Sequence, residues 1–252
     1  MSPKPEEWAV VVGASGAIGS RIVERLAERG LGVLAVGRTR QALEAVGEGL
    51  DRFAVCVADI ADDDSVPLIR DAMPGPCRAA INAAAAPMGG HVDEVSAEAV
   101  LGAVDVKVNG TLRLLRAVDG ELIDDSRIIV LGGNLAYDPI PEAATAGVGN
   151  AALANLIRQL SQSLGKRRVT CHVVAPGPVW TARLRTLLAD AAAARGVSEA
   201  AVMEEFRARS PIGHIVTVDE VAWAVMTLLD PEARALAGGT LLLDAGQRTA
   251  VP

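Results

Sequence analysis

The amino-acid sequence predicts an α/β fold: a single Rossmann-type, doubly wound parallel sheet of about seven strands with helices on both faces. Short apolar, β-branched runs alternate with helical segments along the chain, beginning with Val10–Val12. That run breaks into a glycine-rich turn over residues 13–19, after which apolar side chains recur at helical spacing. A length of 252 residues without an internal repeat or linker favours one domain over residues 1–252.

The strands are expected where short apolar runs end in glycine, proline, asparagine or aspartate. These runs cover residues 10–12, 32–36, 53–57, 78–82, 127–131, 169–175 and 240–244. Right-handed crossovers between parallel strands bring their carboxyl ends to one edge of the sheet. Because ligands of open α/β sheets bind at that edge, the loops after the strands hold the candidate site residues.

Helical spacing of apolar residues predicts two long helices, over residues 96–119 and 144–164, with Ser96 as the N-cap of the first. The second helix contains two glycines, each of which costs about 1 kcal/mol relative to alanine inside a helix. We therefore expect this helix to pack closely against another helix or a ligand. An Ala- and Arg-rich helical segment over about 181–209 is predicted to form a lid over the site. Shorter helices are expected over residues 63–71 and 219–229.

Composition excludes several classes of function. The net charge of −7 disfavours a nucleic-acid partner. No apolar run is long enough to span a bilayer and the N-terminus lacks the form of a secretory signal, so we expect a cytoplasmic protein without a membrane partner. Cys56, Cys77 and Cys171 lie far apart without the spacing of a redox pair or a metal site, so no metal is expected.

The glycine-rich turn is the first candidate binding site. It lies between an apolar strand and a helix, where backbone N–H groups at a helix N-terminus can hold a pyrophosphate. The candidate cofactor residues in this turn are Gly13, Ser15, Gly16, Ala17, Ile18 and Gly19. An ordinary tight turn is the alternative interpretation, but the position at the first strand-to-helix junction favours dinucleotide binding.

Several motifs in the same order resemble the short-chain dehydrogenase/reductase family over the whole chain. The turn at 13–19 is similar to the family's cofactor turn, with its middle glycine one place early. Asn82-Ala83-Ala84 stands where the family has Asn-Ala-Gly, and residues 176–181 match its Pro-Gly-x-Val-x-Thr. The resemblance implies adenine contacts by Asp59 and Ile60, and further cofactor contacts by Asn82 and Ala83. It also implies that the loop at 176–181 holds the nicotinamide amide and the phosphates, through Pro176, Gly177, Val179 and Thr181.

The end of the second strand bears on which nicotinamide cofactor binds. NAD enzymes of this type carry an acidic residue there, which bonds the ribose hydroxyls. This chain has Gly37-Arg38 instead, and a guanidinium favours a 2′-phosphate through charged hydrogen bonds. Arg38 therefore favours NADP over NAD, and the alternative is an exposed surface charge.

The family's catalytic residues are replaced at the positions where the resemblance places them. Gly133 stands at the family's Ser position, Ala146 at its Tyr position and Asn150 at its Lys position. Its Asn in the preceding helix corresponds to Lys107. The family's tyrosine exchanges a proton near neutral pH because a nearby lysine lowers its pKa, and Ala146 cannot do this.

Three interpretations of this replacement remain open. In the first, the chain is a divergent NADP-dependent reductase of a small carbonyl or alcohol substrate. Lys107 or Tyr137 then supplies the proton, Asn134 orients the carbonyl, and Asn150 offers a further polar group. Lys107 could instead extend to solvent or pair with a carboxylate. In the second interpretation the chain binds NADP without turnover, as a sensor or a support for a partner. In the third it is an isomerase or dehydratase on the same fold.

The resemblance also implies assembly with copies of the same chain. In the family, the two long helices pair with their symmetry mates, and the small residues over 144–164 suit close pairing. We expect a homodimer or homotetramer formed through residues 96–119 and 144–164. The expected partners are thus a small-molecule substrate and further copies of this chain.

Overall fold

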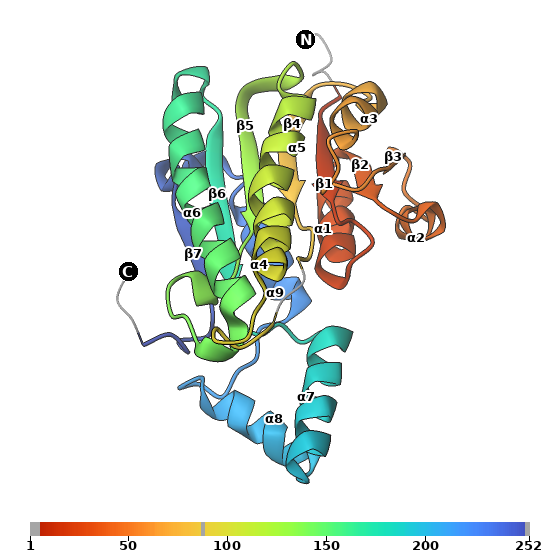
Figure 1. Cartoon of the computed structure of the whole chain (residues 1–252). Coiled ribbons are helices and arrows are strands. Elements are labelled where there is room, and N and C mark those ends of the chain that lie inside the picture. Colours follow the sequence, from red (N-terminus) through yellow and green to blue (C-terminus); the bar gives the residue numbers. More distant parts are fainter. Residues whose placement is uncertain (1–5, 87–88, 250–252) are drawn as a thin grey trace.

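The computed structural model describes residues 6–86 and 89–249. Seven parallel strands form one sheet in the order β3-β2-β1-β4-β5-β6-β7 (Figure 1). The strands are β1 (Trp8–Val12), β2 (Gly32–Gly37), β3 (Phe53–Val57), β4 (Cys77–Asn82), β5 (Leu122–Leu131), β6 (Thr170–Pro176) and β7 (Thr240–Leu243). The predicted doubly wound Rossmann sheet is confirmed. Its order reverses between β1 and β4, which is where such sheets bind ligands.

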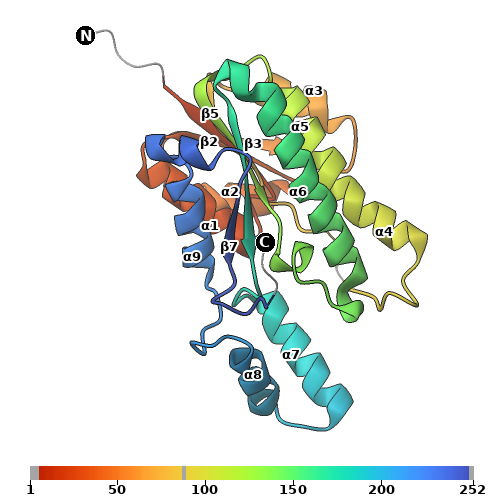
Figure 2. The same cartoon turned by 90° about the vertical axis from the view of Figure 1, so that its left-hand side faces the viewer.

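Two helical layers cover the sheet, as Figure 2 shows from the side. One layer contains α1 (Ala17–Glu28), α2 (Arg40–Val46) and α9 (Val218–Thr227). The other contains α3 (Ser65–Ala72), α4 (Ala97–Val104), α5 (Gly110–Val118) and α6 (Ala144–Leu164). Alternate residues of each strand enter opposite layers: Ala9 and Val11 belong to the first core, and Val10 and Val12 to the second. Continuous apolar strands are therefore required, because both faces of the sheet are buried.

The helix expected over 96–119 is interrupted. Ser96 caps α4 as predicted, because its hydroxyl accepts from the Ala99 N–H. A π-helical turn (Asp105–Asn109) then separates α4 from α5. The Thr111 hydroxyl donates to the carbonyl of Lys107 at 2.7 Å, and such back-bonding competes with the regular helical ladder. The turn changes the direction in which residues 105–109 present their side chains.

The helix α6 has the bounds that the sequence predicts, and its small residues face α4. A Cβ at Gly149 would lie 3.5 Å from the carbonyl oxygen of Ala103. That distance is ordinary van der Waals contact, so the two helices approach closely along this side. The predicted close packing of the glycine-containing helix is thereby confirmed.

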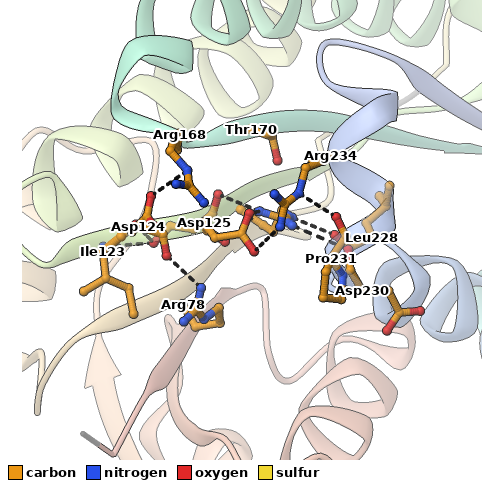
Figure 3. Close-up of polar contacts among 12 residues, drawn as sticks. Arg78, Ile123, Asp124, Asp125, Arg168, Thr170, Leu228, Asp230, Pro231 and Arg234 are labelled. Atoms are coloured by element: carbon orange, nitrogen blue, oxygen red, sulfur yellow. Dashed lines mark hydrogen bonds and ion pairs between the residues drawn. The ribbon is translucent and has the colours of Figure 1, made fainter. Parts of the chain in front are cut away.

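The strand β5 begins five residues before its predicted start, because Leu122 pairs with Cys77 ahead of an irregularity, after which the ladder resumes between Arg127 and Ala79. Asp125 there adopts a left-handed backbone, with φ of 67°. Figure 3 shows the polar network at this end of the sheet. The side chain of Arg127 is 1% exposed and donates to Asp125 and to the carbonyls of Leu228 and Asp230. This network joins β5 to the segment that follows α9.

The segment expected as a lid forms two helices, α7 (Ala182–Arg195) and α8 (Glu199–Ala208). They extend beyond the carboxyl edge of the sheet (Figure 1). The chain reverses at Gly196, which has φ of 64°, a conformation that glycine adopts without strain. A small apolar cluster of Leu184, Leu188, Ala192 and Val202 holds the two helices together.

Membrane-spanning helices and metal-binding clusters are both absent from the described residues. Within the described ranges, no helix has the length and apolarity needed to cross a membrane. The same residues contain no group of three or more His, Cys, Asp or Glu side chains placed to hold a metal ion. The three cysteines are buried and unpaired, and burial raises the pKa of each thiol.

Candidate functional site

The glycine-rich turn lies between the carboxyl ends of β1, β2 and β4. The Gly13 N–H donates to the carbonyl of Val36 at 2.9 Å. Gly13 has φ of 77°, and a Cβ there would lie 2.8 Å from the carbonyl oxygen of Ala83. Gly19 faces the backbone of Gly13 with no room for a Cβ. Close backbone contacts therefore require glycine at both positions. One of these contacts is made by the backbone of Ala83, a predicted cofactor residue.

The N-terminus of α1 offers free backbone donors. Gly16 is the N-cap, and it has no side chain to accept from the first N–H groups of the helix. Ser15, Gly16 and Ala17 are exposed to solvent, with Ile18 half-buried behind them. The helix dipole and these N–H groups together favour an anion. The residues of this turn thus fit the pyrophosphate of a dinucleotide.

Arg38 and Asp59 lie side by side beyond the turn. The Arg38 side chain is 79% exposed, and its Nη1 lies 4.0 Å from Asp59 Oδ2. The hydroxyl of Ser15 lies 3.6 Å from the position of a Cβ at Gly37, so a larger residue at position 37 would contact it. Ile60 is buried against Gly110. The end of β2 thus presents the guanidinium of Arg38, with the Ser15 hydroxyl near Gly37. NAD enzymes of this type have an acidic residue at this place.

Asn82 connects the end of β4 to the π-helical turn. Its Nδ2 donates to the Thr111 hydroxyl at 3.0 Å, and its Oδ1 accepts from the Ala84 N–H. The Thr111 hydroxyl donates in turn to the Lys107 carbonyl. Asn82 therefore positions the backbone on which Lys107 is carried. Each side-chain polar atom of Asn82 thus has one partner within the protein, and the second N–H of its amide remains available.

Lys107 is buried at the carboxyl edge of the sheet. The residue is 8% exposed, and its Nζ donates to the carbonyl of Leu131, the last residue of β5, at 2.7 Å. Burial lowers the pKa of Lys107 from 10.5 to about 8, and the positive charge of Arg183 adds to this effect. No carboxylate in the described residues pairs with this ammonium group. The alternative that Lys107 extends to solvent or forms an ion pair is wrong.

Asn150 of α6 borders the segment that follows β5. It is 5% exposed, and its Nδ2 lies 2.8 Å from the position of a Cβ at Gly133. The amide thus occupies the space that a larger residue at position 133 would need. Ala146, one turn earlier in α6, is also buried and offers no polar atom. The structure brings Lys107 and Asn150 to the same short segment, residues 131–133, from two helical elements that contact each other.

The side chains of Asn134 and Tyr137 contact different parts of the structure. The Nδ2 of Asn134 lies 3.5 Å from the position of a Cβ at Gly177, so this amide borders the loop after β6. The Tyr137 hydroxyl bonds to the hydroxyl of Thr240 in β7. Its ring packs against the apolar core under the sheet. Tyr137 is therefore directed toward β7 and away from Lys107, and the structure does not bring these two predicted proton donors together.

The loop after β6 is tied to its neighbours by backbone hydrogen bonds. The Gly177 N–H donates to the Leu243 carbonyl at 2.9 Å, and Val179 bridges to Val216. Pro176 is the last residue of β6. The Thr181 hydroxyl caps α7 by accepting from the Leu184 N–H. The predicted nicotinamide loop therefore leads directly into the first lid helix.

Trp180 stands between this loop and the lid. Its side chain is exposed, and its backbone N–H donates to the Val216 carbonyl at 2.7 Å. The guanidinium of Arg185 lies 5.7 Å from the centre of the indole ring, within the range of a cation–π contact. Trp180 thus packs against the first turn of α7.

Three polar residues near this edge are absent from the sequence-based prediction: Arg183, Gln247 and Arg248. Arg183 lies in the first turn of α7, close enough to lower the pKa of Lys107. Gln247 and Arg248 follow β7 and are half-buried. The sequence shows only that Arg248 is a cation shortly after the last strand. It does not show that the side chain is half-buried.

Known proteins resemble this chain along most of its length. A family model described as enoyl-(acyl carrier protein) reductase matches residues 13–248. A putative ketoacyl reductase of Streptomyces coelicolor is 28% identical over 258 residues, which cover 98% of this chain and 98% of the relative. Dehydrogenase/reductase SDR family member 4 of Bos taurus is 28% identical over 97% of this chain and 88% of the relative.

Solved structures share the fold. An actinorhodin polyketide ketoreductase variant, crystallised with NADPH, superposes with a TM-score of 0.88. The two chains are 25% identical, and the match covers 98% of this chain and 99% of the other.

Proposed function

The chain belongs to the short-chain dehydrogenase/reductase family, and on that premise we propose that it is an NADP-dependent reductase of a small carbonyl compound, with Lys107 as its proton donor. Membership supports an oxidoreductase that uses a nicotinamide cofactor. The observation that carries the finer proposal is the buried Lys107 ammonium at the end of β5. It is a proton donor located where the expected cofactor and substrate meet.

Arg38 supports NADP rather than NAD. Its guanidinium is exposed at the end of β2, and the residue before it is Gly37, whose Cβ position lies 3.6 Å from the Ser15 hydroxyl. Charged hydrogen bonds from a guanidinium favour a phosphate. The similarity to a ketoreductase variant that was crystallised with NADPH adds support.

The residues of the candidate site then divide between cofactor binding and proton transfer. The nicotinamide cofactor, when bound, supplies the hydride that reduces the carbonyl carbon. The backbone of the glycine turn and the N-terminus of α1 hold its phosphates. Lys107 donates a proton from Nζ to the carbonyl oxygen, and its lowered pKa matches this task near neutral pH. The amides of Asn134 and Asn150 orient that oxygen, and α7 and α8 restrict the access of water.

The test combines cofactor binding with turnover. NADPH and NADH are titrated against the protein, and NADPH consumption is then followed with a panel of ketones, quinones and enones. Tighter binding of NADPH and its consumption with at least one panel member are expected. Binding of NADPH without consumption across the panel would favour a cofactor-binding protein without turnover. Failure to bind NADPH would overturn the proposal.

We also propose that the chain forms a homodimer or homotetramer through α4, α5 and α6. Leu101 on α4 and Val148 on α6 are large apolar residues exposed on this face. Exposed apolar residues on adjacent helices suit a contact between identical subunits. The mass in solution by light scattering tests this, with Val148→Arg expected to shift it toward the monomer. A monomeric wild-type protein would contradict the proposal.

A further inference from the structure

The turn after β7 contains buried polar atoms without partners. Six buried side-chain nitrogen and oxygen atoms in the described part of the chain have no hydrogen-bond partner. Four of the six belong to this turn: Asp244 Oδ2, Gln247 Nε2, and Nε and Nη1 of Arg248. Buried polar groups are nearly always paired, because each unpaired one costs about 1–3 kcal/mol. Three unpaired donors on adjacent residues point to a ligand that accepts hydrogen bonds.

Arg248 differs from the other arginines that are buried in this protein. Arg113 donates to two carboxylates and one carbonyl, and Arg127 is similarly surrounded by acceptors. The Arg248 side chain is 15% exposed, and its Nε lies 4.0 Å from Asp244 Oδ2. That distance is too long for a hydrogen bond. The guanidinium of Arg248 is therefore buried with most of its donors unused.

The turn borders the candidate active site. The Cα of Asp244 lies 3.3 Å from the position of a Cβ at Gly177, in the predicted nicotinamide loop. The Nδ2 of Asn134 lies 3.5 Å from that same position. Further along, the Thr249 N–H donates to Asp138 Oδ2, in the loop after β5. Residues 244–249 thus cross the carboxyl edge of the sheet from β7 to the β5 loop.

Contacts to the lid and within the turn fix its shape. Ala245 has φ of 52°, a left-handed conformation that is uncommon for alanine. The Ser210 hydroxyl, just beyond α8, donates to the Ala245 carbonyl at 2.7 Å. The Gly246 N–H donates to Asp244 Oδ1 at 3.0 Å. A ligand held by Gln247 and Arg248 would therefore meet preorganised donors that are also linked to the lid.

We propose that Gln247 and Arg248 bind a carboxylate of the substrate, so that the carbonyl compound this protein reduces is an oxo acid. A guanidinium and an amide N–H₂ supply the planar donors that match a carboxylate. Lys107 and Arg183, whose positive charges interact with each other at the carboxyl edge of the sheet, also favour an anionic substrate there. The inference rests on the proposed reductase function and names its substrate class.

Paired probes that differ only in charge test the inference. Levulinate and acetoacetate are compared with their methyl esters, by NADPH consumption and by the shift in melting temperature with NADP⁺ present. The wild-type protein should prefer the acids in both measurements. Arg248→Gln should lower the acid-to-ester ratio of kcat/KM about 10- to 100-fold, mainly through the KM of the acid. Arg248→Lys should retain part of the preference, because it keeps the charge.

The matched control is Arg70→Gln on the exposed surface of α3, which removes the same charge and should leave the ratio unchanged. Equal treatment of acids and esters by the wild-type protein in both measurements would overturn the inference. So would an Arg248→Gln variant that weakens acid and ester alike, or one whose oligomeric mass changes, since Arg248 would then serve a subunit contact.

The two proposals fail in different ways. NADPH consumption with equal rates for acids and esters leaves the reductase intact and removes the carboxylate site. Acid-specific stabilisation that Arg248→Gln abolishes, without NADPH consumption by any probe, retains the carboxylate site and removes the reductase.

Discussion

The ammonium of Lys107 donates a hydrogen bond to the carbonyl of Leu131 at 2.7 Å, which joins the π-helical turn to the last residue of β5. One buried cation is thereby held at the edge where the loops after β4, β5 and β6 meet. Its position depends on Asn82 and Thr111, which fix the backbone of the turn.

Replacing Lys107 tests its role in proton transfer. Lys107→Met keeps the length of the side chain but removes the donor, so kcat should fall about 10²- to 10⁴-fold. NADPH affinity should change little, because the ammonium bonds to Leu131 and not to the glycine turn. Steady-state rates and a cofactor titration measure the two effects. Lys166→Met, on an exposed lysine, is the control, and equal rates for both variants would contradict the assignment.

The rate of carbonyl reduction should decrease as pH rises through about 8, the pKa to which burial lowers Lys107. Only the protonated amine can donate, so the rate is highest below that pH. The unfolded chain binds its lysine proton up to about pH 10.5, so stability should rise with pH between these values. Lys107→Met should lose this rise, as pH-dependent unfolding would show. A wild-type rate that increases across pH 8 would contradict the donor role.

Removing the guanidinium of Arg38 should weaken NADPH binding about 10-fold or more, the usual scale of a charged hydrogen bond. NADH binding should change little, because NADH lacks the 2′-phosphate. Titrations of Arg38→Ala with both cofactors give the two affinities, with Arg70→Ala as the surface control. Equal losses of affinity for NADPH and NADH would mean that Arg38 does not bind the 2′-phosphate.

Gly13→Ala should abolish dinucleotide binding and destabilise the protein. A Cβ there would lie 2.8 Å from the Ala83 carbonyl oxygen, in addition to the strain of φ at 77°. Gly49→Ala separates the two effects, because Gly49 has φ of 80° and nothing within 4 Å of its Cβ position. This control should lose only about 1 kcal/mol of unfolding free energy and keep NADPH binding. Similar losses for both variants would show that the clash at Gly13 is unimportant.

Arg127→Met should lower the unfolding free energy by about 2–4 kcal/mol, because it leaves the buried carbonyl of Leu228 without its side-chain donor and removes one of the two arginine partners of Asp125. Arg168 pairs with Asp124 in the same network (Figure 3), but both side chains are largely exposed. Arg168→Ala should therefore cost less than about 1 kcal/mol. Denaturant unfolding compares the two variants. A smaller effect at position 127 than at 168 would contradict this account.

The strands and α6 could be predicted from sequence because their patterns depend on local spacing and burial alone. A strand buried on both faces, such as β2 (Gly32–Gly37), is a continuous apolar run. The start of β5 could not be found in this way, since Leu122 pairs with Cys77 ahead of an irregular polar stretch that no apolar pattern marks. The π-helical turn was also missed. It depends on the Thr111 hydroxyl, whose bond to Asn82 joins residues far apart in sequence.

The parts of the candidate site that a motif determines through the backbone, such as the turn at Gly13, could be predicted from the sequence. The parts that depend on where a side chain points were harder to predict. Tyr137 is in the expected loop, yet its hydroxyl bonds to Thr240, more than a hundred residues along the chain. Arg248 follows the last strand like any surface cation. Its burial arises from packing of the turn beside Gly177, which sequence spacing does not describe.

The placement of Trp180 provides an intrinsic optical probe of the lid. The chain has three tryptophans, of which Trp8 stands at the opposite end of the sheet and Trp223 on the outer surface of α9. Trp180 alone lies at the start of the lid, with Arg185 over its ring. A change in indole emission on ligand binding, absent from Trp180→Phe, would report movement of α7, and energy transfer to a reduced nicotinamide would report its proximity.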